Sequence, residues 1–211
     1  LNMLNTKYIV LNSSGSGSFV ESINEVYSMN REQQTSIPGI LNVNRLGNAW
    51  FVQNVVGYNN VNDEFNALKN LDPSSFAITD TSYEYNKKII GSYNYDSTLR
   101  VQMSEYRANN IVYSVQGLEN KNPSKYFYVV FSEVYYPLGW KAKVDGKQVE
   151  INRVNYTLRG LKIPGGTKEI ELYYELESFK SLSAVALASS SAILLLVLGL
   201  IYLSVFKKKD D

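Results

Sequence analysis

The sequence YFYVVFSEVYYPLGWKAKVDGK, residues 126–147, decides the fold. Its first part, Tyr126 to Phe131, is a continuous apolar run, as expected for the central strand of a sheet. From Trp140 to Val144 apolar residues alternate with lysines, which is typical of a strand. Asp145-Gly146 then predicts the two-residue turn of a β-hairpin. The stretch therefore predicts antiparallel strands.

Short strands are also predicted on both sides of this stretch. Apolar and polar residues alternate from Leu99 to Met103, from Ile111 to Val115 and from Ile170 to Tyr174, and Tyr156 to Leu161 predicts a further strand. Short strands separated so closely by turn signals favour an antiparallel β-sandwich. We therefore expect a sandwich domain over residues 96–177.

Residues 1–95 predict a mixed α+β portion, which we interpret as a truncated domain. Asn62 suits the N-cap of a helix, because its side chain can accept hydrogen bonds from the first backbone N–H groups. In that helix we expect Phe65 and Leu68 to face inward, and Asp72-Pro73 to end it. The fold class is therefore α+β and mainly β.

A long uncharged segment follows the predicted sandwich. Residues 181–206, SLSAVALASSSAILLLVLGLIYLSVF, contain no charged side chain. As a helix they reach about 39 Å, whereas the core of a bilayer is about 30 Å thick. A buried helix of a soluble protein is the alternative, but such helices are shorter and carry a polar stripe. We predict one C-terminal transmembrane helix.

The charges that flank this helix predict its orientation. Lys207, Lys208 and Lys209 follow it directly, so residues 207–211 are expected to form a basic cytoplasmic tail. Residues 1–180 are then extracytoplasmic.

Small residues repeat along one face of the predicted span. Ala184, Ala188 and Ala192 are spaced by four residues, and such a face permits close packing between helices. We expect membrane lipid as one partner and upstream transmembrane helices of the same protein as another. The alternative is a plain lipid anchor in which the small residues have no role.

The composition excludes several kinds of chemistry. The 211 residues include no cysteine and no histidine, which excludes disulfides, thiolate nucleophiles, zinc sites built on Cys or His and a Ser-His-Asp triad. There are 21 basic and 20 acidic side chains, so the net charge of +1 gives no reason to expect nucleic acid as a partner. We expect no cofactor and no metal site.

The most distinctive candidate site follows the predicted central strand. A carboxylate, Glu133, stands near three aromatic residues, Tyr135, Tyr136 and Trp140. Aromatic faces stack on sugar rings and a carboxylate accepts hydrogen bonds from hydroxyl groups, so these residues could contact a glycan. The alternative is a structural corner, in which Trp140 fills the core and Glu133 pairs with a base such as Arg159. Glu133 has no assignable second carboxylate, so we predict no catalytic residue.

A second candidate is the segment NYTLRG. Strand alternation places Asn155, Thr157 and Arg159 on one face, with Tyr156 and Leu158 on the other. Arg159 could bind a carboxylate through two hydrogen bonds. The structural alternative is a satisfied ion pair within the sandwich.

Four motifs together resemble a known family. They are LNMLNTKYIV at the start of the chain, LGNAWFV at 46–52, FSEVYYPLGWKAKVDGK at 131–147 and NYTLRGLKIPGG at 155–166. Their order and spacing, and the hydrophobic helix with a basic tail that closes the chain, resemble the C-terminal region of YfhO-type bacterial membrane proteins.

This resemblance implies a large multi-pass protein of the cell membrane, with about a dozen spans before the present Leu1. Such proteins are similar to the C superfamily of glycosyltransferases, which use lipid-linked sugar donors, and a YfhO relative is associated with glycosylating lipoteichoic acid. In that superfamily the catalytic carboxylate lies near the start of the chain. The resemblance therefore implies that the present segment is non-catalytic.

Two functions follow as alternatives. In the first, the chain is the extracytoplasmic C-terminal domain and last span of a polytopic YfhO-like protein. It assists transfer of sugars from a lipid-linked donor to a cell-envelope glycan or lipid. The expected ligand is the lipid-linked sugar or the envelope glycan. In the second, the chain is a membrane-anchored, non-catalytic β-sandwich that binds an extracellular glycan or protein.

Overall fold

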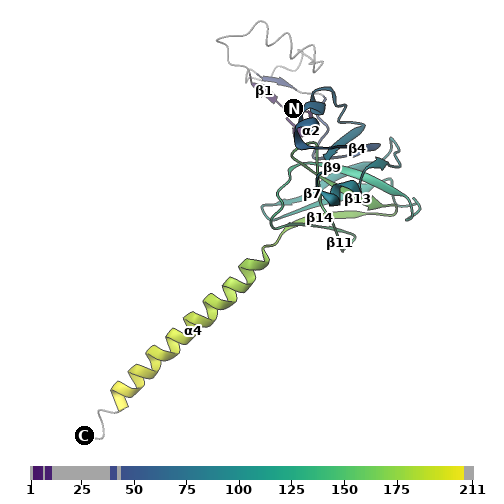
Figure 1. The fold of residues 1–211 in the computed structure, drawn as a ribbon. Coiled ribbons are helices and arrows are strands. Elements are labelled where there is room, and N and C mark those ends of the chain that lie inside the picture. Colours follow the sequence, from purple (N-terminus) through teal and green to yellow (C-terminus); the bar gives the residue numbers. More distant parts are fainter. Residues whose placement is uncertain (1, 7, 11–38, 42–43, 207–211) are drawn as a thin grey trace. The chain divides into compact units, whose positions relative to one another are not determined.

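The computed structural model describes residues 2–6, 8–10, 39–41 and 44–206, and it divides into two compact units (Figure 1). The first unit, Leu1–Tyr173, is rich in strands, and the second, Tyr174–Asp211, contains one long helix. The fold is α+β and mainly β with a C-terminal apolar helix, which confirms the predicted fold class.

Two antiparallel sheets lie face to face as a sandwich. The five-stranded sheet has the order β11-β10-β14-β8-β7 and the four-stranded sheet the order β12-β13-β9-β3. The strands of the first sheet are β7 (Arg100–Arg107), β8 (Asn110–Gln116), β10 (Trp140–Val144), β11 (Lys147–Val149) and β14 (Glu169–Tyr174). Those of the second are β3 (Ala49–Val52), β9 (Tyr126–Val134), β12 (Asn152–Val154) and β13 (Leu158–Pro164). Because β3 pairs with β9, the sandwich takes strands from both sides of the predicted boundary at residue 95.

The main apolar core lies between these two sheets. Alternate residues of β9, among them Val129 and Phe131, meet alternate residues of β8, among them Ile111 and Tyr113. The rings of Tyr113 and Phe131 pack edge to face with their centroids 4.9 Å apart. The predicted period-two alternation of β8 is thus the consequence of one buried face.

The four-stranded sheet is buried on its other face as well. Tyr128 and Val130 of β9 pack in a second core with Trp50 of β3 and with Val55 and Ala77 of a smaller sheet. This sheet has the order β5-β4-β6, and its first two strands are parallel. Burial on both faces explains why the sequence of β9 is continuously apolar.

Short elements complete the described part of the first unit. The remaining strands are β1 (Tyr8–Val10), β2 (Gly39–Leu41), β4 (Asn54–Tyr58), β5 (Phe76–Asp80) and β6 (Gly91–Ser92). The helices are the 3-10 turns η1 (Asn2–Leu4) and η2 (Leu68–Asn70) and the α-helices α2 (Val61–Ala67) and α3 (Glu84–Lys87). Helix α2 lies in the crossover between the parallel strands β4 and β5.

Helix α2 differs from its prediction in two respects. Its N-cap is Asn60, whose side chain accepts hydrogen bonds from the N–H groups of Asn62 and Asp63, both at 3.0 Å. The prediction that Phe65 faces inward is wrong, because this side chain is 51% exposed. Glu64 is instead the residue of α2 that is fully buried.

The second unit contains helix α4 (Glu177–Phe206). Its segment Leu182–Ile201 is long and apolar enough to cross a membrane. The hydroxyl groups of Ser189 and Ser190 donate to the carbonyl of Ala186, at 2.9 and 2.8 Å, so these polar atoms are satisfied within the helix. The predicted tail at 207–211 lies outside the described residues.

Candidate functional site

The structure brings three of the predicted site residues together at one end of the sandwich. Glu133 lies near the end of β9, Arg159 near the start of β13, and Trp140 begins β10. The guanidinium carbon of Arg159 lies 4.1 Å from the centroid of the Trp140 ring, and its Nε donates a hydrogen bond to the carbonyl of Val134 at 3.0 Å. This geometry is a cation–π stack that ties the two sheets together.

The guanidinium of this stack is buried, and only some of its N–H groups have hydrogen-bond partners. The side chain of Arg159 is buried, and this burial lowers its pKa, while the nearby carboxylate of Glu133 raises it. Within the described part of the chain, the two side chains form no direct ion pair, because the guanidinium is turned to Val134 and Trp140. Nη1 of Arg159 and the hydroxyl of Tyr113 are buried without a hydrogen-bond partner there. Burial also raises the pKa of Tyr113, with a smaller contribution from Glu133.

The two predicted tyrosines have different surroundings. The backbone N–H of Tyr135 donates to the carbonyl of Thr157 at 2.6 Å, and its side chain shares a hydrogen bond with Tyr85. Burial raises the pKa of Tyr85, and this hydrogen bond raises it further. Tyr136 is half exposed and stays available for contacts outside the domain.

Asn155 lies in a turn and not on a strand, so the prediction that Asn155, Thr157 and Arg159 share one strand face is wrong. The φ angles of Asn155 and Tyr156 are 48° and 70°, in the left-handed region, and β13 therefore begins only at Leu158. The side-chain oxygen of Asn155 accepts the N–H of Ile78 at 2.9 Å, and its own N–H donates to the carbonyl of Ile78 at 2.7 Å. Asn155 thus fastens the turn to β5.

The same turn surrounds the buried Glu64. Its carboxylate accepts hydrogen bonds from Nη2 of Arg153 and from the N–H of Tyr156, both at 2.8 Å. The carboxylate of Asp80 lies 3.6 Å from the same Nη2. Burial raises the pKa of Glu64, and the bonds to Tyr156 and Arg153 oppose this change. Both Glu64 oxygens are bonded to the protein, so this cluster holds α2 against the turn.

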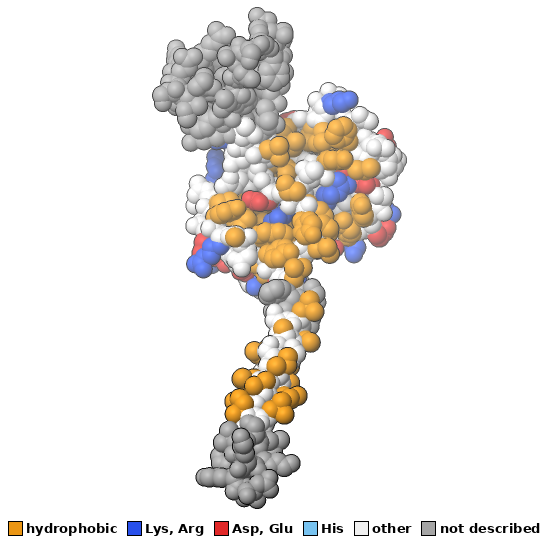
Figure 2. Space-filling view, turned by 90° about the vertical axis from the view of Figure 1, so that its left-hand side faces the viewer, with side chains coloured by type: hydrophobic (Ala, Val, Ile, Leu, Met, Phe, Trp, Pro, Cys, Tyr) orange, Lys and Arg blue, Asp and Glu red, His pale blue; other side chains and the backbone are white. Residues whose placement is uncertain are grey.

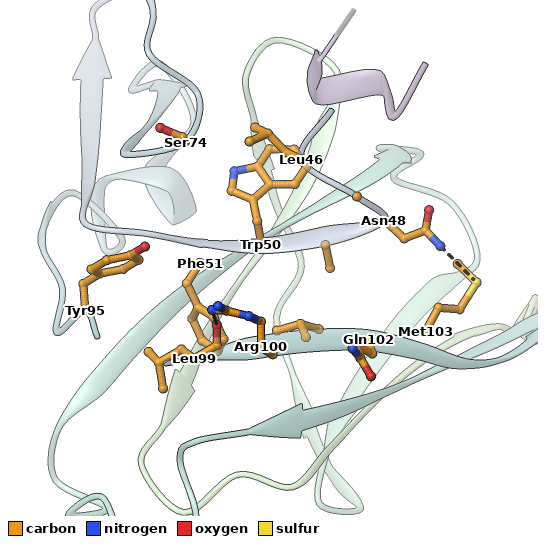
Figure 3. A pocket seen from close by; sticks show the side chains of 13 residues that line it. Leu46, Asn48, Trp50, Phe51, Ser74, Tyr95, Leu99, Arg100, Gln102 and Met103 are labelled. Carbon is orange, nitrogen blue, oxygen red and sulfur yellow. Dashed lines mark hydrogen bonds between the residues drawn. The ribbon is translucent and has the colours of Figure 1, made fainter. Parts of the chain in front are cut away.

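A pocket lies between the free edges of the two sheets (Figure 3). Strand β3 is at the edge of the four-stranded sheet, and β7 is at the edge of the five-stranded sheet. Residues 46–51 and 99–103 from these edges line it, together with Ser74 and Tyr95. Its volume of about 600 Å³ is typical of a site for a small ligand.

The pocket combines aromatic rings with groups that can form hydrogen bonds. Figure 3 shows Tyr95 at one side, Gln102 at the other, and Trp50 and Arg100 between them. Tyr95 and Gln102 are exposed, and so is Arg100, whose Nη1 donates to the carbonyl of Ser97 at 2.6 Å. An accessible aromatic ring beside amide and guanidinium groups is the chemistry that recognises sugars.

Other lining residues are held rigidly. Nε1 of Trp50 donates to the carbonyl of Pro73 at 2.7 Å, and Nδ2 of Asn48 lies 3.5 Å from the sulfur of Met103. The side-chain oxygen of Asn48 accepts a hydrogen bond from Asn5. These contacts fix the floor of the pocket before any ligand enters it.

The backbone of β3 adds further polar groups to the pocket. Asn48 accepts the N–H of Ser132 across the ladder at 2.9 Å. In an antiparallel pair the hydrogen-bonded residues alternate, so Trp50 also pairs with β9, while the N–H and carbonyl groups of Ala49 and Phe51 face the open edge. These backbone groups lie at the side of β3 that borders the pocket.

The loop that carries Tyr95 is fixed by Asp96. This carboxylate accepts hydrogen bonds from Nζ of Lys121 at 2.8 Å, from Oγ1 of Thr98 at 2.8 Å and from the N–H of Thr98 at 3.0 Å. These hydrogen bonds hold the pKa of Asp96 well below its usual range, and the bond from Lys121 has the largest effect. The loop therefore keeps its shape at neutral pH.

The pocket was not predicted from the sequence, because its two walls lie about fifty residues apart in the chain and meet only through sheet pairing. Strand alternation in Leu99 to Met103 and the motif that contains Trp50 are the only signals that point to it. Within the described ranges, no group of three or more acidic side chains could hold a metal ion.

Comparison with known proteins gives one match. The family model with the description "Bacterial membrane protein YfhO" matches residues 51–186, which is more than half of the chain. No curated protein and no solved structure matches the sequence. The matched range includes the β7 wall of the pocket, the Trp140–Arg159 stack and the first part of α4.

Proposed function

We propose a function from the premise that this chain belongs to the YfhO family of bacterial membrane proteins. The sandwich is the extracytoplasmic C-terminal domain of a multi-pass protein of the cell membrane, and α4 is its last span. The domain assists transfer of a sugar from a lipid-linked donor to a cell-envelope glycan or lipid. It does so by holding a glycan in the pocket between β3 and β7.

The pocket is the observation that carries this proposal. Tyr95 offers an accessible ring for a sugar face, and Gln102, Arg100 and the open edge of β3 offer hydrogen bonds to hydroxyl groups. The described residues that line it include no Asp or Glu. A pocket without a carboxylate lacks the pair of Asp or Glu side chains that most glycosidases use, which fits a holding role.

The predicted corner has a different role in this proposal. One face of the Trp140 ring is already covered by the guanidinium of Arg159, so this ring serves the architecture of the sandwich. Glu133 and Tyr136 stay at the surface of the same end and could contact a glycan only from outside.

A binding experiment tests the pocket. The whole chain is reconstituted in phosphatidylcholine nanodiscs and titrated with a soluble glucose tetrasaccharide while saturation-transfer NMR records contact with the sugar protons. Single sites for uncharged sugars are weak, so a Kd of about 1 mM, or about 4 kcal/mol, is expected. Tyr95→Ala and Gln102→Ala should each weaken binding several-fold, because they remove the stacking ring and an amide.

The matched control is Gln148→Ala, which removes the same amide from an exposed position of β11. It should bind as the unaltered chain does. Equal transfer signals in the unaltered chain and both pocket variants would show that the sugar contacts another surface. Absence of any signal with gluco-, galacto- and manno-oligosaccharides would contradict glycan binding.

A second assay separates assistance of transfer from simple binding. Turnover of a polyprenyl-phosphate-linked hexose is measured with the full-length protein that carries this chain. If the pocket assists transfer, Gln102→Ala slows turnover while insertion into the membrane is unchanged. If turnover is the same and only binding is lost, the domain is a membrane-anchored binding module.

A further inference from the structure

One end of the sandwich collects the segments that lead toward helix α4. Strand β14 ends there at Tyr174, and Tyr173 pairs with Asn110 at the start of β8. The β7–β8 hairpin closes at this end, where Arg107 pairs with Asn110. Strand β10 runs opposite to β14, since Lys143 contacts Glu171 and the N–H of Asp145 donates to Glu169. The start of β10 and the β9–β10 loop therefore lie at this end too.

The first described residues pack at the same end. The hydroxyl of Ser132, near the end of β9, donates to the carbonyl of Met3 at 2.7 Å, and Nδ2 of Asn155 lies 3.3 Å from the sulfur of Met3. The 3-10 turn η1 is thus placed beside the end of β9.

This end exposes large apolar side chains, which we name the apolar rim. Each of them is 50 to 65% exposed. They are Leu4 of η1, Tyr106 of β7, Val134 of β9, and Tyr136 and Leu138 of the β9–β10 loop. Strand β14 ends at the left of the domain in Figure 1, and Figure 2 looks at that side, where hydrophobic side chains gather with a few charged ones among them. A gathering of exposed apolar side chains marks an interaction surface.

Charged side chains also lie at this end of the sandwich, among them Glu133 near the end of β9. Arg107 contacts the carboxylate of Glu105, so neither brings a free charge to the rim. The shared feature of the rim residues is their exposed apolar surface, whose removal from water favours binding.

The short linker between β14 and the candidate span limits how far the rim can lie from the start of that span. Between the end of β14 at Tyr174 and the first residue of the candidate span at Leu182 lie only residues 175–181. Even fully extended, such a linker reaches at most about 25 Å. If Leu182–Ile201 crosses a membrane, the end that carries the rim cannot leave the neighbourhood of the bilayer surface.

We propose that the apolar rim rests on the surface of the lipid bilayer and inserts its side chains among the lipid headgroups. Tyrosines are enriched at that depth, where the ring is buried and the hydroxyl stays wet, and two of the rim residues are tyrosines. The contact fixes the orientation of the domain, so that the pocket between β3 and β7 is held at a constant height above the membrane. The inference rests on the span and the rim, and it holds whether or not the pocket binds a glycan.

The absence of cysteine from the sequence permits a direct test. Leu138→Cys is labelled with a fluorophore that responds to polarity, and the whole chain is placed in phosphatidylcholine nanodiscs that carry doxyl-labelled lipid. The fluorophore at position 138 should shift to the blue and lose much of its emission to the lipid quencher. Val134→Cys should behave in the same way, and it serves as a second rim probe if the first variant does not fold.

The matched control is Tyr126→Cys. Tyr126 is exposed as well, at 46%, but it begins β9 and lies about 26 Å from the rim end of that strand. A label there should keep its emission with the same lipids. Equal quenching at 126 and 138, or no quenching at either, would overturn the proposal. A blue shift at 138 without quenching would also overturn it, because the rim would then be covered by protein, such as a second copy.

Discussion

Gly160 shows how a single residue determines the packing of the central sheet. A Cβ atom at this position would lie 2.4 Å from the hydroxyl oxygen of Tyr128 and 2.7 Å from its Cε1. Tyr128 is fully buried between β3 and β13, so its ring has no space to move away. The glycine of the NYTLRG segment is therefore required by the tyrosine on the neighbouring strand.

We predict that Gly160→Ala lowers the free energy of unfolding by about 1–3 kcal/mol, because overpacking forces a buried ring from its position. The measurement is urea unfolding of the whole chain in detergent micelles, followed by tryptophan fluorescence. Gln148→Ala, an exposed change on β11, is the control and should cost less than about 0.5 kcal/mol. Equal stability of the two variants would mean that Tyr128 is free to shift.

At the scale of single residues, local motifs could point to the corner but not to the pocket. A local motif suffices to place Trp140 beside a turn, where it packs partly buried on Arg159. The ion pair of Glu133 with Arg159 that belongs to the same interpretation is not among the ion pairs of the described residues, because the guanidinium contacts Val134 and Trp140. The orientation of Asn155 could not be predicted, because its positive φ is imposed by hydrogen bonds to Ile78, a residue far away in the chain. No local pattern in the sequence indicated that Tyr95 lines a pocket, because the pocket forms only where two sheet edges meet.

At the scale of elements, helix α2 is attached through the hydrogen bonds of a buried carboxyl group and not by an apolar stripe. It has seven residues, too few to be stable by itself in water. Glu64 fastens it to Arg153 and to the turn at Tyr156. This attachment explains why the amphipathic interpretation failed for Phe65, whose ring instead packs on the ring of Tyr156 at the surface, 5.2 Å away.

The raised pKa of Glu64 predicts how its contribution to stability depends on pH. The folded state prefers the protonated carboxyl more than the unfolded state does, so the contribution is complete below the ordinary glutamate pKa of about 4.3 and is lost as the pH rises through the folded value. The free energy of unfolding of the unaltered chain, relative to Glu64→Gln, should therefore fall as the pH rises above about 4.3. Urea unfolding of both chains over this range measures the difference. A difference that grows with pH would show that the bonds to Arg153 outweigh burial.

The strands could be predicted from local patterns, but their partners could not. The turn at Asp145-Gly146 has φ angles of 48° and 78° and joins β10 to β11, as the sequence predicts. The pairing of β3 with β9 joins residues about eighty positions apart, and no local pattern indicates it. The third layer, which buries the second face of β9, was missed for the same reason.

At the scale of the whole molecule, each unit has a composition that suits its surroundings. The first unit buries two apolar cores, and in the second the large apolar side chains of the candidate span, such as Leu187 and Leu195, are exposed. A helix that exposes apolar side chains along its whole length is stable in lipid and not in water. Membership in the YfhO family agrees with this division into a folded domain and a span.

The central claim is that the sandwich lies outside the cell while the lysine-rich end lies inside. Single cysteines at Gln148 in the sandwich and at Lys209 after the span test it most directly. These 211 residues contain no other thiol, and any cysteine elsewhere in the full-length protein is replaced by serine. Intact spheroplasts that produce the full-length protein are treated with a membrane-impermeant maleimide, before and after lysis. The account predicts labelling of position 148 in intact spheroplasts and of position 209 only after lysis. Labelling of position 209 in intact spheroplasts, with position 148 protected until lysis, would contradict it.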